Sequence, residues 1–157
     1  MCHHIYEKQT EVSKKELSTT PSIQYEEDKI GTIAINKIKL NQPLYQIDSI
    51  HNNVEENVTI LKESILPEEE NSILFLAAHS GEGKIAYFNN LDKLQIGDKI
   101  KINYNNKLYI YRIDDIWEEE KTGYIHINKS SNKQLVLTTC SPHKKNKQLI
   151  INSNLIA

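Results

Sequence analysis

What this 157-residue chain has little of already limits what it can do. It contains two cysteines, one of them at position 2, so a framework of disulfides does not hold the fold together. A single arginine, Arg112, and a net charge of −2 leave no basic patch of the kind that binds nucleic acid. No apolar run approaches the roughly 20 residues that span a bilayer, and no signal peptide is visible. We expect one domain with a core of its own.

The first 29 residues differ in composition from the rest of the chain. Residues 5–28 are rich in Glu, Lys, Ser and Thr and offer few side chains that could anchor a core, which predicts a tether or a short frayed helix. Residues 1–4 look like a remnant of expression rather than a native start. We therefore divide the chain into a polar N-terminal tether, residues 1–29, and a folded domain, residues 30–157.

Alternation of apolar and polar residues predicts strands through most of the domain. The expected strands cover residues 30–40 as a pair, 44–47, 72–78, 99–104, 108–117, 124–127, 134–140 and 149–156. Helical spacing of apolar residues predicts a helix over 53–66 and a short helix or turn over 85–94. Seven or eight short strands without a βαβ rhythm indicate an all-β barrel or sandwich with peripheral helices.

The run from Gln134 to Thr139 delivers Cys140 to the end of a buried strand, and Pro142 stops the strand. An isolated cysteine is more often a small buried hydrophobe than a reactive group. A reactive cysteine needs a base or cation that favours the thiolate and donors for an oxyanion. The function of Cys140 therefore depends on its partners.

Four histidines beyond the N-terminal tip are candidate bases for Cys140. His79 ends the apolar run 72–78, and in one barrel two neighbouring strands can present their ends at the same rim. Of the others, His51 is interpreted as a loop residue, His126 as a strand-face residue and His143 as a solvated surface residue. A purely structural His79, bound to backbone, is the alternative.

Four ordered segments resemble those of the sortases, cysteine transpeptidases of the Gram-positive cell surface. They are residues 30–38 followed by 43–45, then 76–80, 91–100 and 137–140, and the resemblance extends from residue 30 to the end of the chain. Ala78 stands where glycine is usual. The resemblance implies a closed or nearly closed eight-stranded β-barrel with one or two short peripheral helices. It leaves the sortase class open, with class D as one possibility.

The same resemblance implies an activity and its residues. Cys140 would be the nucleophile that forms a thioacyl intermediate, and His79 the general acid that protonates the leaving amine. The enzyme would cleave a C-terminal sorting signal of the Leu-Pro-x-Thr-Gly kind. It would transfer the acyl group to an amine, either a peptidoglycan precursor in cell-wall anchoring or a pilin lysine in a pilus.

Neither a cofactor nor a metal is implied, and the acidic run 68–70 lacks the ligand spacing of a calcium site. The enzyme would act at the extracellular face of the cell membrane, anchored by an N-terminal transmembrane helix outside this sequence.

One position departs from the family. The arginine expected at the start of the last strand, where it steadies the substrate carbonyl or oxyanion, is replaced by Gln148. Its amide can still donate a hydrogen bond, but a neutral bond is roughly half as strong as a charged one. Lys147 should point to the opposite strand face. Arg112 is expected to face solvent beside Asp114 and Asp115.

Two other functions remain open. A cysteine hydrolase or protease could use the same two residues and release an acid rather than an amide. A β-barrel binding module without catalysis could hold Cys140 as a buried, inert side chain.

Overall fold

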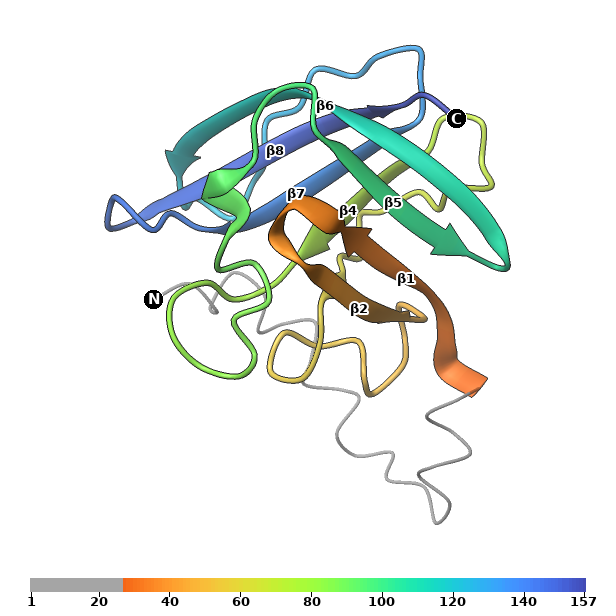
Figure 1. Ribbon diagram of the computed structural model, residues 1–157, viewed down its shortest axis with the longest axis horizontal. Coiled ribbons are helices and arrows are strands. Elements are labelled where there is room, and N and C mark those ends of the chain that lie inside the picture. Colours follow the sequence, from red (N-terminus) through yellow and green to blue (C-terminus); the bar gives the residue numbers. More distant parts are fainter. Residues whose placement is uncertain (1–26) are drawn as a thin grey trace.

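The computed structural model describes residues 27–157, which form a single curved sheet of eight strands in the order β2-β1-β5-β6-β8-β7-β4-β3 (Figure 1). The edge strands β2 and β3 contact each other, so the sheet forms a nearly closed barrel, as expected. The strands are β1 Lys29–Ile35, β2 Leu40–Tyr45, β3 Thr59–Ile60, β4 Ile73–Ala77, β5 Lys99–Tyr104, β6 Lys107–Glu120, β7 Gln134–Cys140 and β8 Lys147–Leu155.

Helices are almost absent from the described part of the chain. Two 3₁₀ helices of three residues occur, η4 Asn36–Ile38 and η5 Leu91–Lys93. Within residues 27–157, neither has the length or the apolar content to cross a membrane. The predicted tether, residues 1–29, lies outside the described residues except for its last three.

The core lies inside the barrel and is continuous with the strands that end near Cys140. Strand β7 is buried on both faces, with Leu135, Val136 and Leu137 inaccessible to solvent. Strand β5 alternates buried and exposed residues, with Ile100 and Ile102 facing the core. A covered strand suits branched aliphatic side chains, whereas alternation suits a strand with one wet face. Both patterns were predicted from the sequence.

Strands β4 and β7 form a parallel pair, the feature of the fold that matters most for function. Their register runs from Ile73 opposite Gln134 to Ala77 opposite Thr138. Parallel strands point their carboxyl ends to the same edge of a sheet. The residues that follow β4 and those that end β7 therefore lie at one rim of the barrel.

The β5–β6 hairpin turns through Asn105 and Asn106, both with positive φ, at 50° and 66°. This is the backbone of a two-residue turn whose twist matches that of the flanking strands, and asparagine tolerates it well. The predicted hairpin is confirmed.

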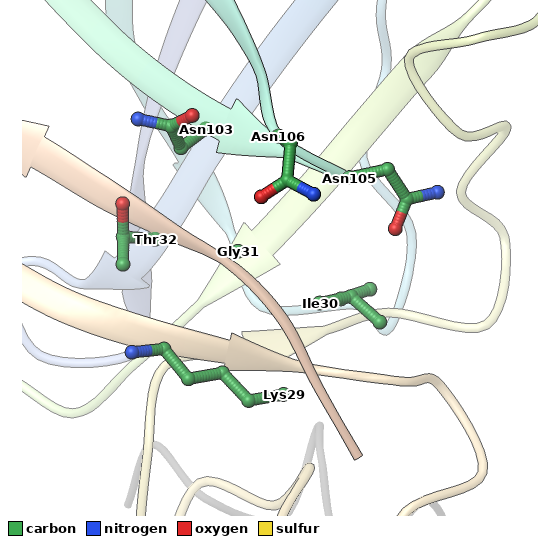
Figure 2. Close-up of a pocket in the computed structure, with 7 residues that line it drawn as sticks. All are labelled: Lys29, Ile30, Gly31, Thr32, Asn103, Asn105 and Asn106. Atoms are coloured by element: carbon green, nitrogen blue, oxygen red, sulfur yellow. The ribbon is translucent and has the colours of Figure 1, made fainter. Parts of the chain in front are cut away.

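Strand β1 passes unusually close to β5 at Gly31. A Cβ atom placed on Gly31 would lie 1.8 Å from the backbone oxygen of Asn103. Figure 2 shows the polar pocket beside this close approach of β1 and β5. It is lined by Lys29 to Thr32 from β1 and by Asn103, Asn105 and Asn106 from β5 and its turn. Only glycine fits this position, because a side chain would collide with backbone.

The predicted helix over 53–66 is wrong. Asparagine side chains hold the segment in turns: Asn53 accepts from the Glu55 amide at 3.0 Å, and Asn57 donates to the His51 carbonyl at 2.9 Å. Such side-chain bonds to nearby backbone compete with a helix. The apolar residues pack instead on the barrel, with Val54 and Leu61 in a cluster with Ala77. Residues 85–94 form turns and the short η5, which agrees with the predicted short helix or turn.

The predicted strand over 124–127 is also wrong, because these residues form no strand. Its neighbours in sequence, β6 and β7, each already have a strand on both sides: β6 pairs with β5 and β8, and β7 pairs with β8 and β4. No ladder position is therefore left for residues 124–127 at this side of the sheet.

Candidate active site

The ends of β4 and β7 are fastened together beyond their last paired residues. Ala78 donates its amide to the Thr138 carbonyl at 3.4 Å, and the Thr139 hydroxyl donates to the Ala78 carbonyl at 2.7 Å. One step further, the Ser80 hydroxyl donates to the carbonyl of Cys140 at 3.0 Å. These bonds hold the backbone on either side of His79 against the backbone that carries Cys140. The structure thus places both residues at the same rim.

His79 is largely buried, with 15% of its side chain exposed, and its Nε2 lies 3.1 Å from Oε2 of Glu55. Glu55 belongs to the turns that precede β3. A carboxylate at this distance orients the ring and stabilises an imidazolium. The sequence predicted Glu55 only as part of a helix, and no local signal linked it to a histidine 24 residues away.

Cys140 is the last residue of β7, partly exposed, and lies opposite Gln148 of β8 in the antiparallel register. Its Sγ lies 3.6 Å from Nζ of Lys121, which follows the end of β6. Cys140 is disulfide-bonded in the structure. Chemistry at its thiolate therefore belongs to the reduced protein.

A cavity of about 290 Å³ opens beside Cys140. Its walls are rich in lysine, and they are formed by Lys121, Cys140, Ser141, Lys144, Lys145, Asn146 and Lys147. Two of these lysines have carboxylate partners on β6: Lys144 lies 3.9 Å from Glu118, and Lys147 lies 4.0 Å from Glu120. The surroundings of Sγ are nevertheless positively charged on this side.

Gln148 is buried, with 1% exposed, and its Nε2 donates to the Tyr124 carbonyl at 3.1 Å. Its Oε1 is buried and has no hydrogen-bond partner in the described part of the chain. The neighbouring Lys147 was expected to point away from the site, yet it lines the cavity beside Cys140. Arg112 is exposed on β6, as expected.

The other histidines lie apart from this arrangement. His126 and His143 are surface side chains, 81% and 66% exposed, that pair with Glu119 and Asp92. His51 lies in the loop between β2 and β3, as expected, and is buried, with its ring 5.4 Å from that of Tyr45. Within the described residues, no group of three His, Cys, Asp or Glu side chains could hold a metal ion.

Several solved structures with the same fold are sortases. Sortase C1 of GBS Pilus Island 1 is 25% identical, with a TM-score of 0.70 and coverage of 83% of this chain and 66% of that chain. The complex of Streptococcus agalactiae sortase C1 with MTSET is 25% identical, with a TM-score of 0.71, covering 87% and 74%. Streptococcus pneumoniae sortase C is 24% identical, with a TM-score of 0.74, covering 94% and 76%. This chain thus spans about two thirds to three quarters of their length.

No curated protein sequence matches the chain. The family model that describes the sortase domain matches residues 33–156, which is almost the whole of the barrel. The fold of the chain and the match to the family model both identify a sortase domain. The chain therefore belongs to the sortase family.

Proposed function

We propose that this sortase is a cysteine transpeptidase that cleaves a C-terminal sorting signal of the Leu-Pro-x-Thr-Gly kind through a thioacyl-enzyme and transfers it to an amine. The observation that carries the proposal is the parallel pairing of β4 and β7, which ends with His79 and Cys140 at one rim. A nucleophile and a general acid must share such a site before either can act.

In the first half of the reaction, the Cys140 thiolate attacks the carbonyl carbon after the Thr-like residue and forms an S–C bond. The carbonyl oxygen takes up negative charge in the tetrahedral intermediate. The C–N bond then breaks, and protonated His79 gives its proton to the leaving amine. Glu55, 3.1 Å from Nε2, stabilises the imidazolium that this step requires.

In the second half, an acceptor amine attacks the thioester carbonyl and forms a new C–N bond. The C–S bond breaks and returns the thiolate, and neutral His79 takes the proton that the amine loses. The acceptor is a peptidoglycan precursor or a pilin lysine. A pilin lysine is supported by the pilus sortases among the similar structures. The barrel, residues 30–157, acts at the outer face of the cell membrane.

The proposal is tested by trapping the acyl-enzyme from a pool of candidate sorting peptides on the reduced protein. Mass spectrometry should find the protein heavier by one peptide fragment that ends at the Thr-like residue, with the added mass on Cys140. Adding an amine should then discharge the adduct to an amide. Discharge only to the acid would identify a hydrolase. If neither the peptide pool nor a thiosulfonate modifies Cys140, the protein is a binding module.

The His79–Glu55 pair leads to a prediction of its own. Changing Glu55 to Gln keeps the shape of the contact but removes the charge, so we expect kcat/KM to fall about 10-fold, less than loss of the general acid itself. The steady-state rate of peptide transfer measures this. Glu63→Gln is the matched control, an exposed carboxylate in the same region. Equal rates for Glu55→Gln and Glu63→Gln would show that Glu55 does not support His79.

Gln148 is expected to assist substrate positioning more weakly than an arginine would. Gln148 is 1% exposed and lies beneath the cavity lining, so its second Nε2 hydrogen and its Oε1 reach the substrate backbone only when the Tyr124 segment moves aside. Gln148→Ala should lower turnover about 10-fold, since it removes neutral hydrogen bonds. Lys147→Ala, one residue away and 35% exposed, should change it by less than about 2-fold. Unchanged turnover in Gln148→Ala would remove this residue from the site.

A further inference from the structure

A lysine occupies the surroundings of the proposed nucleophile where the family arginine is missing. Lys121 Nζ lies 3.6 Å from Cys140 Sγ, a disulfide sulfur in the structure that becomes the thiolate on reduction. The backbone of Lys121 is held as well, because its amide donates to the Asn146 carbonyl at 3.1 Å, which ties the end of β6 to the β7–β8 loop. The ammonium therefore extends to Sγ from a backbone that is tied to the β7–β8 loop.

The other cationic side chains near Cys140 are engaged elsewhere or lie further out. Lys144 is 66% exposed and lies near Glu118, and Lys147 lies near Glu120. Gln148, opposite Cys140 in the sheet, is neutral. Lys121, which lines this cavity, brings its ammonium to 3.6 Å from Sγ.

We propose that Lys121 supplies the positive charge at the catalytic centre, stabilising first the Cys140 thiolate and then the oxyanion of the tetrahedral intermediate. The proposal rests on the transpeptidase function above and assigns it a further catalytic residue. An opposite charge in contact with sulfur favours the thiolate over the thiol. The carbonyl oxygen that becomes the oxyanion is two bonds from Sγ, within reach of the same ammonium.

The role assigned to Lys121 requires no proton transfer from it. The proton that leaves with the amine comes from His79, and Lys121 keeps its charge through both halves of the reaction. Its contribution is largest where the cavity wall excludes water, since charges interact more strongly in a medium of low dielectric. A flexible ammonium from the end of β6 thus replaces a planar guanidinium from β8.

The first test measures the rate at which iodoacetamide modifies Cys140 as a function of pH. The full chain carries Cys2→Ser, so Cys140 is its only cysteine. Several charged groups surround Cys140, and all except Lys121 are kept constant: His79 after β4, Glu118 and Glu120 on β6, and Lys144, Lys145 and Lys147 on the β7–β8 loop. In Lys121→Met the pH midpoint of alkylation should rise by about one unit, whereas Lys121→Arg should stay near the parent.

The matched control is Lys129→Met, an exposed lysine on the same β6–β7 connection, which should leave the midpoint unchanged. A Lys121→Met midpoint equal to that of Lys129→Met would overturn the proposal. Lys121→Gln serves as a second neutral variant if methionine impairs folding, as judged by circular dichroism. This readout needs no sorting peptide, so it separates the role of Lys121 from the transpeptidase function.

The second test uses the sorting peptide that forms an adduct in the trapping experiment and measures the rate at which it acylates Cys140. Lys121→Met should slow acylation about 100-fold, the loss typical of one oxyanion donor, and Lys121→Arg should recover most of the rate. Acylation at the parent rate in both neutral variants would remove Lys121 from the oxyanion site. If the parent protein forms no adduct with any peptide, the transpeptidase proposal fails, while the alkylation result still decides whether Lys121 stabilises the thiolate.

Discussion

Cys140→Ala is expected to abolish acyl-enzyme formation and to lower peptide transfer by at least about 1,000-fold, because alanine offers no nucleophile and the thioester cannot form. The rest of the rim stays in place, since the bond from Ser80 goes to the backbone carbonyl of residue 140 rather than to its side chain. The measurement is the initial rate of amide formation in the presence of a reductant.

The control for this variant is Cys2→Ala, which removes the other cysteine and should keep the parent rate. In the presence of a reductant, the thermal unfolding midpoint of Cys140→Ala should stay close to that of the parent, because a partly exposed strand end tolerates loss of one atom. Residual transfer above a tenth of the parent rate, in a folded variant, would mean that another group attacks the substrate and that Cys140 is not the nucleophile.

Gly31→Ala is expected to be the most destabilising single substitution that we consider, at about 3 kcal/mol or more of unfolding free energy. The added Cβ would lie 1.8 Å from the Asn103 backbone oxygen, and a backbone atom cannot move aside as a side chain can. The pairing of Gly31 with Tyr104 and of Thr32 with Asn103 would have to open. Urea unfolding measures the loss.

Thr32→Ala, on the same strand, provides the comparison for Gly31→Ala. It removes a half-buried side chain without adding an atom between the strands, so we expect a loss of less than about 1 kcal/mol. Equal unfolding midpoints for Gly31→Ala and the parent would show that β1 can move away from β5 at little cost.

The alternation or continuity of apolar residues was sufficient to predict several of the strands. Alternation predicted β5, β6 and the Asn105–Asn106 turn, and the unbroken aliphatic run predicted β7. The helix over 53–66 is absent partly because Asn52, the residue before it, donates to the carbonyls of Ile47 and Ile60, bonds that a helical period does not reveal. Side-chain bonds to nearby backbone decided that segment, not its propensity.

The candidate site was predictable only in part. Buried runs ending at His79 and Cys140 could be recognised in the sequence, but the parallel register that places their ends at one rim belongs to the sheet. Glu55 lies 24 residues from His79 and Lys121 lies 19 residues from Cys140, so neither contact follows a local spacing. Their side chains are typical surface residues by type, and only the folded chain gives them a partner.

The parallel pairing of β4 and β7 also bears on how the protein folds. The two strands are joined by a connection that contains β5 and β6, so the rim cannot form until residues about 60 apart have met. Contacts of such long sequence separation form slowly, because the entropy of closing the loop must be lost before the pairing is gained. During synthesis, β4 emerges well before β7 and stays unpaired on that side until β7 has been made. Assembly of the rim therefore waits for β7, and a chain released before β7 would carry the histidine without its cysteine.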